Sequence, residues 1–147
     1  MKKQEYLDLK KRHEQEVTDF PIAYAFNDEQ LKEALQKLEV ESVSECVTVF
    51  GHGDIVRRGD AKKFIDMLKR QTKEVKDKLI EDKEFAEEAF LYEMNNHEYC
   101  INYDGDDEVL RCFGLEWEDL KTYGLENAYR LARNEHMRLA REEWDLI

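Results

Sequence analysis

Proline and glycine are scarce in this sequence, and their scarcity limits the possible folds more than any other feature. One proline and six glycines occur in 147 residues. A β-sandwich needs many tight turns, which are commonly built with these two residues. Long helices with short connections need few of them, and the abundant Glu, Lys, Leu and Ala favour helix as well. We therefore predict a mainly helical chain.

Hydrophobic periodicity predicts where these helices lie. Apolar residues recur every three or four positions in seven segments, several of which begin at a capping residue or end at a glycine. Asn27 and Asp60 are the expected N-caps of two helices, and Gly114 is the expected left-handed terminator of another. The seven segments are residues 2–17, 27–38, 61–80, 83–98, 106–113, about 117–124 and 126–145.

Short runs without helical periodicity predict a small sheet. Residues 20–26 are almost wholly apolar, and residues 46–56 contain two extended runs separated by the turn sequence Gly51-His-Gly-Asp54. Such a turn between two runs favours a hairpin. Residues 99–103 are also expected to be extended. The predicted fold class is therefore α+β, predominantly α-helical, with five to seven helices and one small sheet, in a single domain over residues 1–147.

Charge is unevenly distributed along this acidic chain, whose net charge is −12. Residues 81–108 hold eleven acidic residues and one basic residue, a net −10, whereas residues 57–80 hold nine basic and four acidic residues, a net +5. An acidic protein repels free nucleic acid and attracts basic protein surfaces. We therefore expect carboxylates of the acidic segment to form a protein-binding face. They are Glu84, Glu87, Glu88, Asp104, Asp106, Asp107 and Glu108.

The basic segment 57–80 leaves an alternative function open. Its arginines and lysines could contact the phosphates of a nucleic acid, as in a small regulatory protein. Salt bridges to the neighbouring acidic segment 81–98 would instead neutralise them, although each exposed pair contributes little free energy. The charge pattern favours the salt bridges, and direct binding of nucleic acid is not expected.

Motifs of known catalytic and metal sites are not found in the sequence. Position 101 is Ile, so His97-Glu98 does not begin the H-E-x-x-H pattern of zinc proteases. The glycine turn around His52 lacks the lysine of a P-loop, and no G-x-S-x-G occurs. We therefore expect no catalytic residue, no metal and no cofactor.

Two chemical alternatives stay open around the histidines. One is a metal-assisted hydrolase that uses His52 and His97 with nearby carboxylates, with His136 as a further candidate ligand. The other is a cysteine nucleophile, Cys100 or Cys112, paired with His97, although nothing in the sequence shows that these residues lie close together.

Cysteine usage and hydropathy indicate the cellular setting. Three cysteines without a C-x-x-C pair indicate reduced thiols rather than a disulfide framework. The basic N-terminal residues are not followed by an apolar run, so a signal peptide is not expected. No stretch approaches the ~18 apolar residues of a membrane span. We expect a cytoplasmic protein without membrane contact. The apolar helix faces could also form the interface of a homodimer.

Four motifs, in this order, resemble a family of small acidic proteins. They are Phe20-Pro-Ile-Ala-Tyr-Ala-Phe-Asn-Asp-Glu-Gln-Leu31, Arg57-Arg58-Gly59-Asp60-Ala61, Glu93-Met-Asn-Asn-His-Glu-Tyr99 and Val109-Leu-Arg-Cys-Phe-Gly-Leu115. The resemblance covers roughly residues 20–120, and the family consists of uncharacterised proteins of bacteria, phages and mobile elements.

The resemblance implies a biological context and no activity. Small acidic accessory proteins of phages often bind and inhibit a host protein, including nucleases such as CRISPR effectors. Together with the acidic segment, this context leads us to expect a non-enzymatic accessory protein that inhibits a host defence system. Its acidic face would block a basic, nucleic-acid-binding surface of the host protein.

Overall fold

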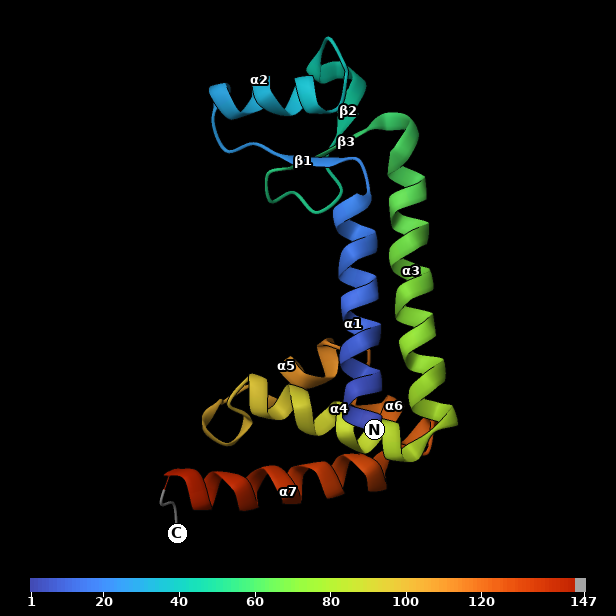
Figure 1. Ribbon diagram of the computed structural model, residues 1–147, viewed down its shortest axis with the longest axis vertical. Helices are drawn as coiled ribbons and strands as arrows, with labels where there is room; N and C mark the ends of the chain where they lie inside the picture. The colour runs from blue at the N-terminus through green and yellow to red at the C-terminus, as the bar shows by residue number, and fades with distance from the viewer. Residues whose placement is uncertain (145–147) are drawn as a thin grey trace. The chain divides into compact units, whose positions relative to one another are not determined.

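The computed structural model describes residues 1–144, which form seven α-helices and a three-stranded antiparallel sheet (Figure 1). The predicted α+β, mainly helical fold class is confirmed. Contacts within the chain cluster in two compact units. The first unit consists of Met1–Lys10 and the chain from Thr72 onward, and the second is Lys11–Gln71. The single domain over residues 1–147 stays a prediction, and each unit is described by itself.

The second unit contains the sheet. Its strands are β1 (Ile22–Tyr24), β2 (Cys46–Val47) and β3 (Asp54–Arg57), in the order β1-β3-β2 with both pairs antiparallel. The predicted sheet segments 20–26 and 46–56 are thus confirmed. The central strand places Val56 opposite Ile22, and both side chains are buried in an apolar cluster with Phe64 and Met67.

A helix and a short 3₁₀ turn complete this unit. Helix α2 (Asp28–Lys37) begins where sequence analysis predicted, because the Asn27 side chain accepts a hydrogen bond of 2.8 Å from the Gln30 amide. The 3₁₀ helix η1 (Val43–Glu45) begins at Ser42, whose side chain forms a capping box with Glu45. Ala34 and Leu38 of the α2 region pack in a second apolar cluster with Ala23 and Cys46.

Asp54 organises the turn between β2 and β3. Its carboxylate is 1% exposed and accepts hydrogen bonds from the amides of Val49 (2.7 Å), Phe50 (3.0 Å) and His52 (3.2 Å), and from the Thr48 hydroxyl (3.1 Å). Burial by itself raises the pKa of Asp54, but these donors outweigh burial and lower the pKa to about 2. The turn is therefore built around a carboxylate that is ionised at neutral pH.

The boundary between the two units falls inside the long helices α1 (Lys2–Asp19) and α3 (Arg58–Glu81). Helix α3 begins at Arg58, so the prediction that Asp60 is its N-cap is wrong. Asp60 lies in the first turn of the helix and accepts a 2.8 Å bond from the Arg57 guanidinium. The strand β3 runs directly into the helix, which leaves no separate capping residue between them.

The first unit packs four further helices around an aromatic core. They are α4 (Lys83–Asn96), α5 (Gly105–Arg111), α6 (Trp117–Thr122) and α7 (Glu126–Trp144), and α4 and α7 lie side by side (Figure 1). Phe90 of α4 is fully buried and meets the rings of Phe113 and Tyr129 edge to face. Gly114 has a φ of 65° after α5, as predicted for a left-handed terminator.

The prediction that residues 99–103 are extended is wrong. Residues Tyr99–Ile101 form a 3₁₀ helix, η2. Its backbone amides donate to neighbouring residues or to α7 and not to a strand. The Ile101 amide donates to the carbonyl of Glu98, and the Cys100 amide donates to the His136 ring. Apolar composition alone does not separate such a turn from a strand.

Across residues 1–144, none of the helices combines the length and the apolar composition that crossing a membrane requires.

Candidate metal centre

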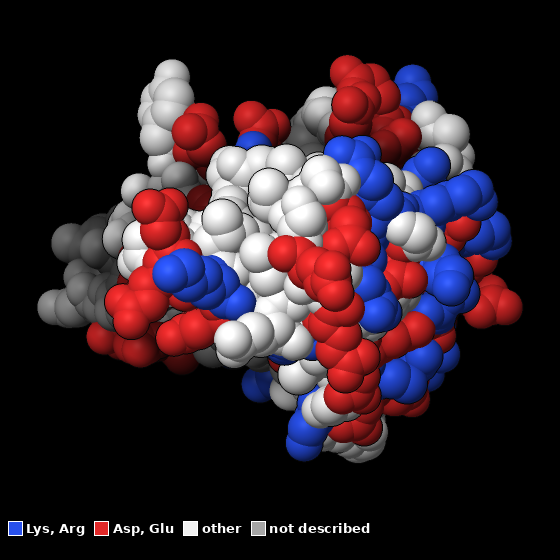
Figure 2. Space-filling model, turned by 90° about the horizontal axis from the view of Figure 1, so that it is seen from above, with Lys and Arg blue, Asp and Glu red and all other residues white. Residues whose placement is uncertain are grey.

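Five of the seven carboxylates that we assigned to an acidic face form no ion pair with any residue in the range 1–144. The pKa of Glu87 is raised, first by burial and then by the nearby charges of Glu88, Glu84 and Glu135, which shows that negative charges accumulate there. On the face seen in Figure 2, acidic and basic side chains are interspersed around an uncharged area. The five carboxylates without an ion pair are Glu84, Glu87, Glu88, Asp104 and Asp107.

The other two carboxylates, Asp106 and Glu108, are held by side chains of their own unit. Asp106 Oδ1 accepts hydrogen bonds from the hydroxyls of Tyr99 (2.7 Å) and Tyr129 (2.5 Å). Glu108 accepts from the Asn102 amide group and lies 2.9 Å from the His97 ring. Both therefore have structural partners within the first unit.

The basic segment 57–80 is paired mostly with acidic residues of its own helix and of α1. Sequence analysis expected partners in the segment 81–98 instead. On α3 the i,i+4 spacing brings Lys62 and Lys73 each to an aspartate one turn away, which explains part of the difference. The pairs include Lys62–Asp66 (2.9 Å), Lys73–Asp77 (2.6 Å), Arg57–Asp60 (2.8 Å), Arg70–Glu16 and Lys78–Glu5 (3.7 Å).

The structure does not place His52 in a metal-ligating group with His97. His52 is exposed in the β2–β3 turn of the second unit, whereas His97 belongs to the first unit. The group of metal-ligating side chains found around His97 within residues 1–144 does not include His52.

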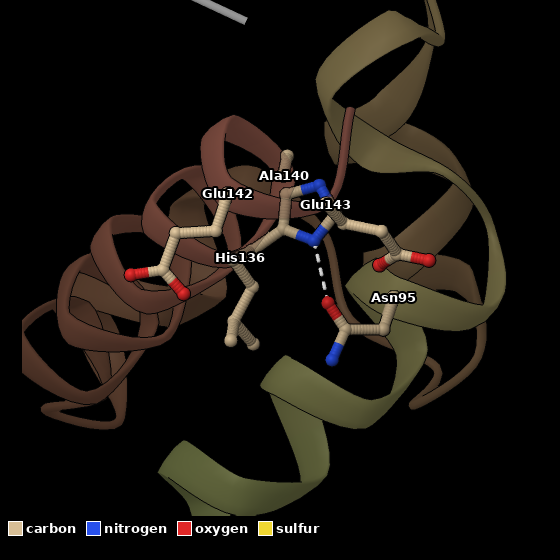
Figure 3. A pocket seen from close by; sticks show the side chains of 6 residues that line it. Asn95, His136, Ala140, Glu142 and Glu143 are labelled. Carbon is tan, nitrogen blue, oxygen red and sulfur yellow. Dashed lines mark hydrogen bonds between the residues drawn. The ribbon is translucent and has the colours of Figure 1, made fainter. Parts of the chain in front are cut away.

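Both ring nitrogens of His136 form hydrogen bonds within the first unit. It is 3% exposed and lies beside a pocket of about 460 Å³ (Figure 3). Its Nδ1 is 2.7 Å from Asn95 Oδ1, and its Nε2 accepts a 3.1 Å bond from the Cys100 amide. This pattern fixes a neutral ring with its proton on Nδ1, and burial lowers its pKa accordingly. Neither nitrogen is free to bind a metal.

Glu93 places a carboxylate inside the core of the first unit. It lies on α4 and is 1% exposed. Its Oε2 accepts hydrogen bonds from the Tyr6 hydroxyl and from Lys10 Nζ, the latter at 2.7 Å. Its Oε1 is buried and has no hydrogen-bond donor. A buried carboxylate oxygen without a partner is costly, so this atom needs an explanation.

His97 and Cys112 lie next to that unpartnered oxygen. His97 follows Glu93 by one helical turn, and its Nε2 is 3.6 Å from Glu93 Oε1 and 3.4 Å from Cys112 Sγ. Its Nδ1 is 2.9 Å from Glu108 Oε1. Because Glu108 accepts the Nδ1 proton, a neutral His97 directs the lone pair of Nε2 toward Glu93 and Cys112.

Two of the three distances among the ligand atoms suit a tetrahedral zinc site. Glu93 Oε1, His97 Nε2 and Cys112 Sγ all lie within 4.8 Å of one another. With Zn–S bonds of ~2.3 Å and Zn–N or Zn–O bonds of ~2.1 Å, tetrahedral ligand atoms are roughly 3.4–3.6 Å apart. The distances from His97 Nε2 to Cys112 Sγ, 3.4 Å, and to Glu93 Oε1, 3.6 Å, agree with that range. A cation among these atoms would also give Glu93 Oε1 its missing partner.

Residues around the cluster orient its ligands. Glu108 holds the His97 ring through Nδ1, as carboxylates do for metal-binding histidines. Tyr6 and Lys10 hold Oε2 of Glu93 and leave Oε1 directed at the cluster. Glu93 lies on the buried side and Cys112 is exposed, so the cluster reaches from the core to the surface.

The same side chains also have the order of a nucleophilic triad, with Cys112 as thiol, His97 as base and Glu108 as orienting acid. A cysteine nucleophile needs a lowered pKa. Although Cys112 is exposed as a residue, partial burial of its sulfur, followed by the charge of Glu93, raises the pKa of Cys112 to about 11. A metal cation reverses this effect, because it favours the thiolate directly. The raised pKa of Cys112 therefore argues against a nucleophile, whereas the geometry suits a metal ligand.

Sequence analysis considered Cys112 with His97 but missed Glu93. The available signal was the i,i+4 spacing of Glu93 and His97, which places both side chains on one face of a helix. Cys112 lies fifteen residues beyond His97 on a different helix end, and only the packing of α5 on α4 brings it near.

Comparison with known proteins adds a family and no activity. A family model described as a family of unknown function (DUF7659) matches residues 5–135, a range that includes Glu93, His97 and Cys112. No curated protein and no solved structure matches the chain.

Proposed function

This chain belongs to that family of unknown function, so we propose its role from its own side chains: it binds a divalent metal ion, Zn²⁺, through Glu93, His97 and Cys112. The observation that carries the proposal is the buried Glu93 Oε1, which has no donor and lies beside the other two ligand atoms. A mixed set of oxygen, nitrogen and sulfur ligands suits Zn²⁺ among the divalent ions.

Three protein ligands leave a fourth tetrahedral position. In zinc proteins such a position holds a water molecule or a substrate, and the ion lowers the pKa of the water to about 7. The exposed side of Cys112 is where solvent can reach this cluster. The site would therefore suit the metal-assisted hydrolysis that sequence analysis left open, with His97 as a ligand and with Glu93 and Cys112 in the place of His52.

The proposal predicts stoichiometric zinc binding. We expect isothermal titration calorimetry and elemental analysis of the purified protein at pH 7 to give one Zn²⁺ per chain. Loss of one ligand in Cys112→Ser or His97→Gln should lower the affinity for Zn²⁺ by about 100-fold or more. Glu108 only orients His97, so Glu108→Gln should lower the affinity by about 10- to 100-fold. Titration with Co²⁺ should give a thiolate charge-transfer band that Cys112→Ser lacks.

Two matched variants serve as controls. Cys100→Ser changes a cysteine outside the cluster, and His52→Gln changes a histidine of the other unit, so both should bind Zn²⁺ like the unchanged protein. Wild-type protein without stoichiometric zinc, or a Cys112→Ser variant with unchanged affinity, would refute the assignment. Circular dichroism verifies that each variant is folded.

A second function, which we also propose, is inhibition of a host defence protein by the acidic face. What supports it is the group of five carboxylates without ion pairs in the range 1–144, together with the like-charge effect on the pKa of Glu87. Their charge is available to a basic partner, and an accessory protein of a phage or mobile element would use it against a nucleic-acid-binding surface. Ion pairs occupy much of the basic segment, so it offers less to nucleic acid.

The inhibitor proposal predicts competition with nucleic acid. We expect the protein to displace target DNA from a host CRISPR effector in a mobility-shift assay, with a potency that falls as salt rises. Changing Glu84, Glu87, Glu88, Asp104 and Asp107 to their amides together should abolish displacement. The matched control Asp66→Asn with Asp77→Asn removes carboxylates that pair with lysines of α3 and should leave displacement intact. Displacement by the five-residue variant would contradict the proposal.

A further inference from the structure

The first unit has a second candidate site, separate from the metal cluster. A pocket of about 860 Å³ lies between α6, the first half of α7, Tyr99 and Asp106. Pockets of ~300–1,000 Å³ are typical for small-molecule ligands. None of Glu93, His97 and Cys112 lines it, so its function does not depend on whether the metal cluster binds an ion.

An exposed aromatic wall forms one side of this pocket. The side chain of Trp117 is 57% exposed, and its ring is perpendicular to that of Tyr129, with centroids 6.0 Å apart. Tyr129 and Tyr99 both donate their hydroxyl hydrogens to Asp106 Oδ1, which holds the tyrosine behind Trp117 in place. A large apolar ring exposed over a rigid support is suited to stacking against a flat ligand.

Cations without carboxylate partners line another side. Arg130 and Arg133 lie one turn apart on α7 and are exposed, and the structure gives neither an ion pair within residues 1–144. Arg130 donates only to the side-chain oxygen of Asn127, at 2.6 Å. Arg138, farther along the same helix, is bound by both Glu135 and Glu142. In a chain with a net charge of −12, two guanidinium groups left without acids are available to an anion.

Besides Asp106, the carboxylates of Glu118 and Glu126 line the pocket, so we expect its ligand to carry hydrogen-bond donors as well as an anionic group. Carboxylates in such sites accept hydrogen bonds from hydroxyl or amino groups, as they do from the ribose in dinucleotide sites. A flat ring, an anionic group and hydroxyl or amino donors together describe one class of ligand. We propose that this pocket binds a nucleoside phosphate, with the base on Trp117 and the phosphate on Arg130 and Arg133.

Fluorescence of Trp117 tests this assignment directly. The chain has two tryptophans, so Trp144→Phe leaves Trp117 as the single reporter. We expect saturable quenching by adenosine monophosphate, because the base covers the indole ring. Adenosine should bind roughly tenfold or more weakly, since it lacks the phosphate that makes charge-assisted hydrogen bonds. The double change Arg130→Gln with Arg133→Gln should lower the affinity for adenosine monophosphate to that of adenosine.

A matched variant on the same helix separates this site from general charge effects. Arg138→Gln also removes one guanidinium group from α7, but that group already has two glutamate partners, so affinity should not change. Three results would each overturn the proposal: no saturable response to adenosine monophosphate, equal affinity for adenosine, or equal affinity for inorganic phosphate measured by calorimetry. Unchanged binding in the double arginine variant would overturn it as well.

Discussion

Replacing Asp54 by asparagine will lower the free energy of unfolding by about 3 kcal/mol, because four donors converge on its buried carboxylate. An amide offers one acceptor oxygen, and its NH₂ group faces donors that it cannot bond. Val49 and Phe50 donate to one oxygen of Asp54, and His52 and Thr48 donate to the other, so one of these two pairs would lose its acceptor. Urea denaturation followed by circular dichroism measures the loss, and hydrogen exchange should show faster exchange at the amides that lose their acceptor.

The same residue makes stability depend on pH. Folding lowers the pKa of Asp54 from its ordinary 3.8 to about 2, so the ionised carboxylate stabilises the folded state above pH 3.8. That contribution, about 2 kcal/mol, is lost as the pH falls through about 2. The difference in the free energy of unfolding between the wild type and Asp54→Asn should therefore vary by less than about 0.5 kcal/mol from pH 5 to 7. At lower pH this difference should become smaller.

Asp66→Asn is the matched control for this prediction. Asp66 is an exposed aspartate that pairs with Lys62 on the same helix, and such a pair contributes about 0.5 kcal/mol or less. An equal loss of stability in the two variants would show that the hydrogen bonds to Asp54 do not stabilise the turn. A stability difference independent of pH down to 2 would contradict the lowered pKa.

Replacing Phe90 by alanine should cost about 3–5 kcal/mol of the free energy of unfolding. Phe90 is fully buried in the first unit, and its ring centroid lies 5.1 Å from that of Phe113 and 5.2 Å from that of Tyr129. Removal of the ring loses its burial and both edge-to-face contacts and leaves a cavity among rigid aromatic neighbours. Urea denaturation at pH 7 measures this change.

Phe26→Ala removes the same ring from a position that is 74% exposed. We expect it to change the free energy of unfolding by less than about 1 kcal/mol. A loss of similar size at both positions would mean that the ring at position 90 does not owe its effect to burial.

Most helices could be predicted because their signals are local. Asn27 caps α2 through its own side chain, and Gly114 adopts the left-handed conformation that ends α5. Apolar spacing located the segments between such ends. These signals act within a few residues of one another, so the order of residues is enough to find them.

Local signals failed where distant groups decided the conformation. The segment 99–103 has an apolar, extended appearance, yet the Cys100 amide is bonded to His136, thirty-six residues away. Asp60 has the character of a cap, but β3 continues into α3 without a break and makes capping unnecessary. In both places the pairing of backbone groups depends on elements that the local sequence does not contain.

The candidate site also depends partly on local sequence and partly on contacts between distant segments. The sequence placed a carboxylate, an imidazole and a thiol in the chain, and the helical repeat put Glu93 and His97 on one helix face. Their chemistry depends on neighbours. Tyr6 and Lys10 of α1 hold one oxygen of Glu93, and the packing of α5 brings Cys112 to the other side of His97.

The sequence by itself determined the helical class, the positions of most helices, the two sheet segments and the separation of acidic from basic charge, because each follows from short-range periodicity or composition. Only the tertiary structure decided that a carboxylate oxygen of Glu93 is buried without a donor beside His97 and Cys112. Burial and distance are properties of packing among segments far apart in the chain, and no local pattern encodes them.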